Sequence, residues 1–339
     1  MRVRALALRI IQQFIRDKRT LALIFLAPLL IMTLLNFVFN GQAIKPDIGA
    51  VSLPQQLTER LENADADVTM FTDKEQAEKA LANGELDAVI SIDNGKPSIR
   101  LEGSDPTISK AVMLLLQKSI QAETAAVQPS ISYLHGKDDM SSFDSFGPVL
   151  IGFFSFFFVF MLAGVAFLRE RTTGTLERLL ATPIRRQEIV AGYLLGFGVF
   201  TLLQAALIAW YSIGVLGLYM TGSIWLVLLV NLLLTLTALT LGTLLSTFAS
   251  SEFQIIQFIP IVIVPQVFFS GLFNLESMDP WLQKLSYIMP LFYGADAMRG
   301  IMIRGESFGD IQLDIYVLIG FSAAFALLNI LALKKQRSI

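Results

Sequence analysis

The chain of 339 residues contains no cysteine and one histidine, His135, and only 16% of its residues are charged. Without cysteine it can form neither a disulfide nor a thiolate metal site. Soluble domains average about 25% charged residues, so the low charge and the 54% of hydrophobic residues argue against one ordinary soluble domain. A lone histidine in a polar connector is more typical of an exposed side chain than of a catalytic or metal site, and we expect no metal site.

The sequence also lacks a nucleotide-binding motif. The pattern G-x-x-x-x-G-K-[S/T] occurs nowhere, and the Gly-Lys pairs at Gly95 and Gly136 are followed by Pro97 and Asp138. That loop cradles phosphate groups, so we expect no ATP site in this chain. The apolar stretches carry no charged residue in their middle, which an ion-coupled carrier would need. We also expect no catalytic residue and no nucleic-acid partner.

Long hydrophobic runs, by contrast, are plentiful. A helix needs about 20 apolar residues to cross a bilayer, and the mean hydropathy of the chain is +0.61. Six stretches meet this length: Leu21–Phe39, Pro148–Leu168, Ile189–Leu216, Ile224–Phe248, Phe253–Phe273 and Ile315–Leu333.

Basic residues gather on one side of these six spans. Six precede the first span, five lie in the loop 169–188 and three follow the last span, whereas the other side carries more acidic than basic residues. Basic residues mark the cytoplasmic side of membrane proteins. We therefore expect both termini and the loop 169–188 to be cytoplasmic.

Residues 1–19 predict an amphipathic helix at the membrane interface. The apolar residues that share one face are Val3, Leu6, Ile10 and Phe14. The arginines that recur every seven residues on another face are Arg2, Arg9 and Arg16. A basic flank that only sets the orientation of the first span is the alternative.

Two polar or broken segments are expected on the outer side. Residues 41–145 alternate between strand-like and helix-like patterns in the order β-α-β-α-β-β-α, which predicts a small external α/β domain. Residues 276–305 are apolar but contain charges and are interrupted by Pro280 and Pro290. They predict one or two short interfacial or re-entrant helices. Gly192 and Gly196 form a G-x-x-x-G pair that predicts close helix packing.

The loop after the second span reads "RERTTGTLERLLATPIRRQEI" from Arg169 to Ile189. Leucines lie on one side of a short helix in this loop, charged residues lie on the other, and Pro183 ends it. Thr173 or Thr175 is expected to cap its N-terminus. Such a charged helix, held between two spans, is suited to receive force from a soluble partner.

The longer stretch "RERTTGTLERLLATPIRRQEIVAGYLLG" resembles the segment after the second span in bacterial ABC-2-type transporter permeases. The resemblance implies that residues of about 173–183 form a coupling helix that docks on an ATP-binding subunit. The residues to which it assigns this contact are Arg169, Glu170, Arg171, Gly174, Thr175, Leu176, Glu177, Arg178, Leu179 and Pro183.

The same resemblance implies the partners and the location. Two ATP-binding subunits would carry the ATP and Mg²⁺, so this chain itself would need no cofactor. A second permease chain, identical or homologous, would pair with it through spans one and five. The complex would sit in a bacterial inner or plasma membrane among its lipids, with the external short helices closing the outer end of the pathway.

Glutamines in and near the fifth span are candidates for lining that pathway. They are Gln254, Gln257 and Gln266, and Pro260 and Pro265 lie among them. Hydrogen bonding between helices is the alternative role of such amides.

We therefore predict an α-helical integral membrane protein with six transmembrane helices. An amphipathic N-terminal helix precedes them (1–19), the first span is 20–40, a small α/β domain is inserted at 41–145, and the other five spans occupy 146–339. The predicted function is export of an amphiphile, such as a drug, antibiotic, peptide or lipid, without an ATPase site of its own. The alternative is a non-transporting receptor or scaffold that acts through the external domain.

Overall fold

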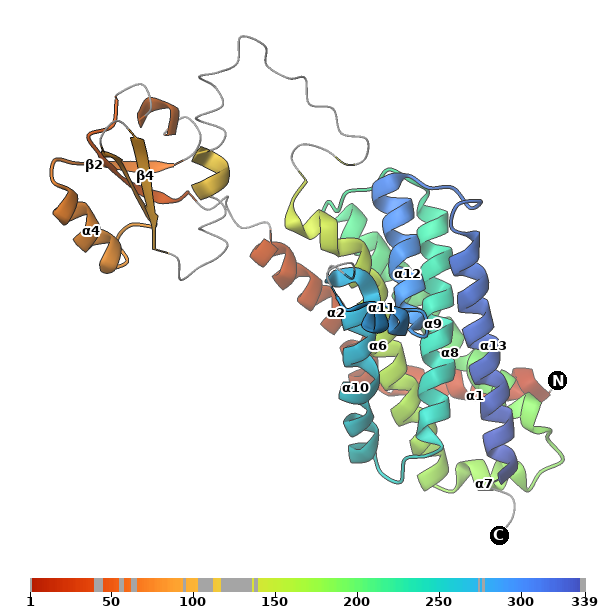
Figure 1. Cartoon of the computed structure of the whole chain (residues 1–339). Coiled ribbons are helices and arrows are strands. Elements are labelled where there is room, and N and C mark those ends of the chain that lie inside the picture. The colour runs from red at the N-terminus through yellow and green to blue at the C-terminus, as the bar shows by residue number, and fades with distance from the viewer. Residues whose placement is uncertain are drawn as a thin grey trace. The chain divides into compact units, whose positions relative to one another are not determined.

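The computed structural model describes residues 2–39, 45–54, 58–61, 66–93, 96–102, 112–116, 136, 140–273, 275 and 278–335 (Figure 1). His135 lies outside the described residues. The chain divides into two compact units. One consists of residues 1–41 and 133–339, and the other is an inserted domain, Gln42–Ser132.

All six predicted spans are confirmed as helices long and apolar enough to cross a membrane. The described part of the chain thus has the architecture of a multi-pass membrane protein. The six helices are α2 (Lys18–Phe39), α6 (Ser142–Thr172), α8 (Arg186–Gly214), α9 (Ile224–Ser246), α10 (Glu252–Val267, continued by the π-helix η1, Phe268–Leu272) and α13 (Gln312–Lys335).

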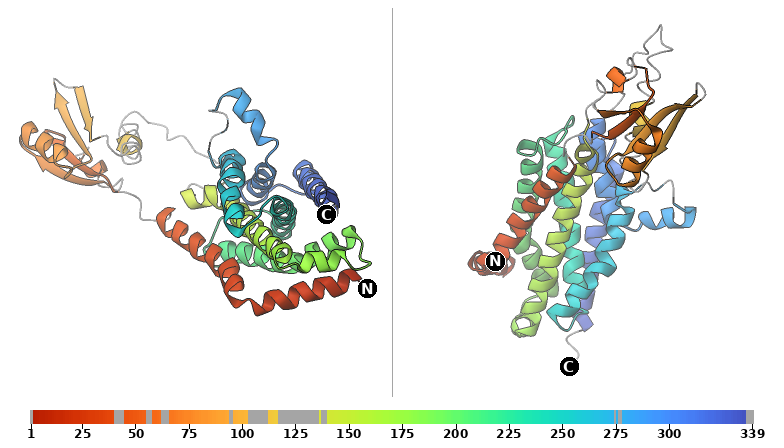
Figure 2. Two further views of the ribbon diagram at one scale, coloured as in Figure 1. Left: turned by 90° about the horizontal axis from the view of Figure 1, so that it is seen from below. Right: turned by 90° about the vertical axis from the view of Figure 1, so that its left-hand side faces the viewer.

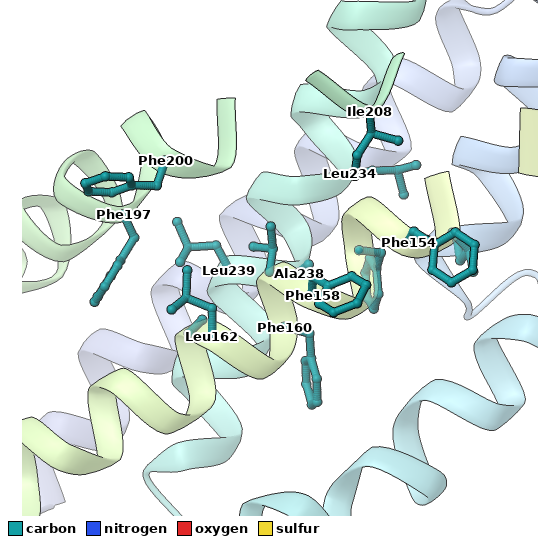
Figure 3. Close-up of a cluster of buried hydrophobic side chains, with 14 of the residues drawn as sticks. Phe154, Phe158, Phe160, Leu162, Phe197, Phe200, Ile208, Leu234, Ala238 and Leu239 are labelled. Carbon is teal, nitrogen blue, oxygen red and sulfur yellow. The ribbon is translucent and has the colours of Figure 1, made fainter. Parts of the chain in front are cut away.

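Helix α6 forms the centre of the first unit. Its phenylalanine run is buried at Phe154, Phe156, Phe158 and Phe160. These rings belong to a cluster that includes side chains of α8 and α9, such as Leu234 (Figure 3). Burying a large apolar side chain stabilises a soluble fold by about 1.5–3 kcal/mol, but between spans the gain comes from close packing. The run is therefore mainly a packing surface inside the bundle.

Helix α1 (Arg2–Arg16) runs across the bundle, whereas α2 runs along it (Figure 2). Its buried residues are Leu6, Ala7, Ile10 and Phe14, so the predicted apolar face is confirmed, with Val3 only partly covered. It packs on the two glycines of α8. A Cβ atom at Gly192 would lie 2.6 Å from Leu6 Cδ2, and one at Gly196 would lie 2.8 Å from Ile10 Cβ. The predicted close packing is confirmed, and its partner is α1.

Two short helices connect α10 to α13. Helix α11 (Pro280–Ser286) carries the exposed Trp281, while α12 (Pro290–Arg299) is followed by the π-helix η3 (Gly300–Arg304). Helix α12 is more deeply embedded than an interfacial helix, because Leu291, Ala295 and Met298 are fully buried among the spans.

The inserted domain is a small α/β fold, as predicted. Its sheet has the order β2-β1-β3-β4, in which β1 pairs in parallel with β2 and β3, and β3 pairs antiparallel with β4. Residues 58–61 and 112–116 are helical, and Ile48, Leu61, Ile90 and Val112 meet in one core. The regular elements are β1 (Asp47–Val51), β2 (Asp67–Phe71), α4 (Lys74–Ala82), β3 (Ala88–Asp93) and β4 (Lys96–Leu101).

Candidate functional site

The loop between α6 and α8 contains a short helix, α7 (Thr175–Leu180), as the sequence predicts. Its N-cap is Gly174, with φ of 70°, and no side chain caps it. The expected threonine cap is therefore wrong. The turn out of α6 needs a left-handed residue, which glycine adopts without steric cost. The Thr173 hydroxyl instead donates a 2.7 Å hydrogen bond to the Arg169 carbonyl.

Helix α7 has one anchored side and one exposed side. Leu176 is 1% exposed and belongs to the main hydrophobic cluster, against which Leu179 and Leu180 also pack. Glu177 and Arg178 are exposed, and neither side chain has a charged partner among the described residues. The helix is therefore fixed to the bundle by its leucines and presents a carboxylate and a guanidinium outward.

The first of three consecutive charged residues at the end of α6 is Arg169. Its Nε donates a 2.7 Å hydrogen bond to Oε1 of Glu252, the first residue of α10. Its Nη1 also lies 3.9 Å from Oδ2 of Asp17, the residue between α1 and α2. Hydrogen bonds from Thr20, together with the charge of Arg169, lower the pKa of the Asp17 carboxyl below its ordinary value. Arg169 thus joins three segments through ionised groups.

The second residue, Glu170, is buried. Its Oε2 accepts a 2.5 Å hydrogen bond from Nη2 of Arg9, on α1. Partial burial alone would lower the pKa of the Arg9 guanidinium, but the hydrogen bond and charge of Glu170 outweigh it and raise the pKa. A buried carboxylate needs such a partner, because desolvating an unpaired charge is costly. The pair therefore fixes α1 to the end of α6.

The third residue, Arg171, binds the turn between α9 and α10. Its guanidinium donates to the carbonyls of Ser246 at 3.1 Å and Thr247 at 2.7 Å, and also to that of Ala249. The last carbonyls of a helix have no partner within it, and a cation there also interacts favourably with the helix dipole. Arg171 thus supplies the C-terminal cap of α9.

The far end of the loop is tied to α1 as well. Arg2 Nη1 donates a 2.5 Å hydrogen bond to the carbonyl of Pro183, the predicted helix-ending proline, and lies 3.9 Å from Oε2 of Glu188. Glu188 Oε2 in turn accepts a 2.7 Å bond from the Arg185 N–H at the start of α8. Helix α1 therefore holds both ends of the loop that carries α7.

The ten residues assigned to ATPase contact do not form one exposed surface. Arg169, Glu170 and Arg171 bind partners within the chain, Leu176 is buried in the bundle, and Glu177 and Arg178 are exposed. Contact of any of the ten with another subunit stays a prediction. Sequence reasoning did not identify Arg9 as part of this site. The seven-residue spacing of Arg2 and Arg9 was the available signal, because it places both on one face of α1.

The three candidate pathway glutamines lie in different surroundings. Gln254 Oε1 accepts a 2.7 Å hydrogen bond from the Ser250 N–H, and Gln257 is exposed. Gln266 is buried, and its Oε1 accepts a 2.9 Å bond from the Leu291 N–H at the start of α12. Gln266 therefore makes the hydrogen bond between helices that was the alternative, whereas Gln254 bonds only to the turn that precedes its own helix. Their place in a pathway stays a prediction.

No group of three histidine, cysteine or acidic side chains is arranged to hold a metal ion in the described part of the chain. The end of α6 and the loop that follows it contact α1, α9 and α10, and such contacts can transmit movement between helices. The loop does not gather a nucleophile, a base and a stabilising group in one pocket.

Comparison with known proteins gives one family match. The family described as "ABC-2 family transporter protein" matches residues 18–331. The chain is similar to ABC transporter G family member 20 of Dictyostelium discoideum, with 27% identity over 66% of this chain and 30% of that protein. It is similar to the probable multidrug ABC transporter permease YbhS of Escherichia coli K12, with 26% identity over 53% of this chain and 48% of YbhS.

A third relative is the inner membrane transport permease YhhJ of Escherichia coli K12, with 29% identity over 52% of this chain and 47% of YhhJ. The chain thus spans about half the length, or less, of these relatives. The matched family extends over nearly all the described helices, from the first candidate span to the last.

Proposed function

The chain belongs to the ABC-2 family of transporter proteins, and we propose that it forms the membrane-spanning subunit of an exporter. A separate ATP-binding subunit, present in two copies, would hold ATP and Mg²⁺ and supply the energy. The chain would lie in a bacterial inner membrane with both termini and α7 on the cytoplasmic side. Two observations support this placement: the relative YhhJ is named an inner membrane transport permease, and the basic residues gather on one side of the spans.

The observation that carries the proposal is the construction of α7. Its buried Leu176 joins it to the bundle, while Glu177 and Arg178 stand exposed. A partner that bound these charges could displace α7. Helix α7 follows directly on the end of α6, where residues 169–171 contact α1, the end of α9 and the start of α10. Differential contacts in two states are what an allosteric change requires.

The proposed cargo is an amphiphile such as a drug, antibiotic, peptide or lipid. One relative is named a probable multidrug permease, which supports this class. The spans also present amides and apolar side chains rather than fixed charges near their middles. A small ion would need charged or closely spaced polar ligands along such a path.

Co-purification tests the assignment. The full chain, isolated from its native membrane in mild detergent, is expected to bring down an ATP-binding subunit. Glu177→Lys should weaken that association and reduce ATP-dependent efflux of an amphiphilic dye, while membrane insertion stays intact. Glu85→Lys, an equally exposed charge reversal on the inserted domain, is the matched control and should leave both unchanged.

Two results would contradict the proposal. One is a Glu177→Lys chain that binds the ATP-binding subunit and exports dye as the unaltered chain does, which would remove α7 from the contact. The other is the absence of any ATP-binding subunit in the purified complex, which would favour a receptor or scaffold acting through the inserted domain.

A further inference from the structure

A cavity of about 340 Å³ lies beside the junction of α1 and α2. Residues of α1, α2 and α6 form most of its wall, and α8 and α10 each contribute one residue. Its volume falls within the range of small-molecule sites, about 300–1,000 Å³. The position is defined by the first turns of α2 and α10, by the last turns of α6 and by Phe197 in the first half of α8. All four lie in the same half of the candidate spans.

The wall of this cavity is apolar along most of its length. Phe14, Ile24 and Leu162 are buried residues of the main hydrophobic cluster and line it. Leu23 and Ile256 also line it, and they are 48% and 52% exposed on the outer faces of α2 and α10. Exposed apolar side chains on spans face the hydrocarbon of the membrane. The cavity therefore reaches the membrane-facing surface between α2 and α10.

One end of the cavity is charged, through Asp17, Arg19, Arg169 and Glu170. Three of these groups already have partners. Glu170 binds Arg9, and Arg169 binds Glu252. The two oxygens of Asp17 accept bonds from the backbone N–H and the hydroxyl of Thr20, at 3.2 and 2.6 Å.

The fourth charged group, the Arg19 guanidinium, is exposed and makes no hydrogen bond or ion pair with a described side chain. Arg16 and Lys18, on either side of Asp17, are exposed or partly exposed as well. The uncompensated charge at the mouth is therefore positive. Arg19 is also the second residue of the first span, which places it at the depth of lipid headgroups.

We propose that this cavity binds an anionic phospholipid of the membrane, with one acyl chain against its apolar wall and the phosphate at Arg19. The occupant must be apolar over most of its length and negative at one end, and it must arrive through the membrane-facing opening. Anionic lipids gather at clusters of basic residues next to a span. A cationic amphiphile would meet the unpaired guanidinium with like charge, and a neutral one would leave it unmatched.

A lipid in this position would touch α1, α2 and α6 at once. A ligand that binds only the folded arrangement stabilises it, and the stabilisation grows with the ratio of the free ligand concentration to Kd. The bound lipid would therefore hold α1 against the bundle near the Arg9–Glu170 pair. This inference concerns a resident lipid and does not require transport or an ATP-binding subunit.

Photolabelling of the purified full chain in neutral detergent tests the inference. The probes are lysophosphatidylglycerol and lysophosphatidylcholine with the same acyl chain, which carries a diazirine. The anionic probe should label peptides that contain residues 10–24 and 161–170, at concentrations at least tenfold lower than the neutral probe. Unlabelled phosphatidylglycerol should compete, and phosphatidylcholine should not.

Matched variants separate the charge from the cavity. Arg19→Gln should remove most of the preference for the anionic probe, whereas Arg16→Gln, the same change three residues earlier and outside the cavity wall, should keep it. Ala166→Phe should fill the cavity and abolish labelling of both peptides. Leu23→Trp obstructs the exposed mouth, and it tests the same point if Ala166→Phe does not yield a folded chain.

Three results would overturn the proposal. Equal labelling by the two probes would remove the role of the phosphate. Equal losses in Arg16→Gln and Arg19→Gln would mean attraction to a diffuse basic surface. Unchanged labelling in Leu23→Trp and Ala166→Phe would place the lipid outside the cavity.

Discussion

Nη2 of Arg9 lies 2.5 Å from Oε2 of Glu170, although the two residues are 161 positions apart in the chain. The contact joins the helix that runs across the bundle to the last turn of the central span. Glu170 is buried while Arg9 is partly exposed, so the carboxylate depends on the arginine more than the reverse. Several properties of the chain can be tested from this pair and its neighbours.

Arg9→Ala should destabilise the chain and loosen α1. The change leaves the Glu170 carboxylate buried without its partner, which costs roughly 3–5 kcal/mol. The apparent unfolding temperature in detergent should fall, and trypsin should cut α1 faster. The double variant Arg9→Ala with Glu170→Gln should recover part of the loss, since no charge is then left buried. The two residues would act independently if Glu170→Gln lowered the stability of Arg9→Ala as much as it lowers that of the unaltered chain.

Gly196→Leu should displace α1 from α8. A Cβ at this position would already lie 2.8 Å from Ile10 Cβ, so a larger side chain must push the two helices apart. Protection of the α1 amides in hydrogen exchange should drop. Gly198→Leu on the same helix is the control, because a Cβ atom at that position would meet nothing within 4 Å. Equal exchange in the two variants would mean that α1 does not depend on this contact.

Arg171→Ala should open the turn between α9 and α10. Three carbonyls would lose their donor, and the Ala249 N–H and its neighbours should exchange faster with solvent. Arg171→Lys should restore only part of the protection, because an ammonium group lacks the planar fork that reaches several carbonyls at once. Full protection in Arg171→Ala would show that the guanidinium does not cap α9.

The predicted orientation can be measured with two equivalent substitutions. The chain has no native cysteine, so Ala82→Cys at the end of α4 and Ala181→Cys after α7 are unique labels at exposed sites. In intact cells a membrane-impermeant maleimide should react with the cysteine at position 82 only. Reaction at position 181 should require permeabilised cells. The opposite pattern would reverse the topology.

The family resemblance predicts a second permease chain, and exposed residues near the middle of α2 and α10, beyond the turns that line the cavity, offer a surface for it. Leu30 and Ile261 are 60% and 68% exposed, and the family resemblance assigns spans one and five to the dimer interface. Cysteines at either position should form crosslinked dimers in native membranes. Leu195→Cys, exposed on α8, is the control and should stay monomeric. Dimers through position 195 alone would move the interface to α8.

The spans and the inserted domain could be predicted because each depends on local composition and periodicity. The fixed partners of residues 169–171 could not, since Glu252, Arg9 and Ser246 lie 75 to 161 positions away. A charged residue at the end of a span looks alike whether it meets solvent, lipid phosphate or another helix.

Two local features could not be predicted from the sequence pattern either. The cap of α7 was assigned to a threonine because threonines favour that position, but the turn out of α6 requires the left-handed backbone of Gly174. The segment before the sixth span was predicted to form interfacial or re-entrant helices, and the sequence pattern did not decide between the two positions. In the structure Arg299 donates to the Gly271 carbonyl, so its charge is accommodated while α12 enters the bundle.

Three neighbouring side chains at the end of α6 reach three different helices, and this arrangement constrains the length of that helix. One residue turns an α-helix by about 100°. Inserting a single residue between Phe160 and Arg169 would rotate all three contacts away from their partners together, while the buried phenylalanines stayed in place. A deletion would do the same in the opposite sense. The number of residues in this segment should therefore be fixed, and a single insertion should be more damaging than a conservative substitution within it.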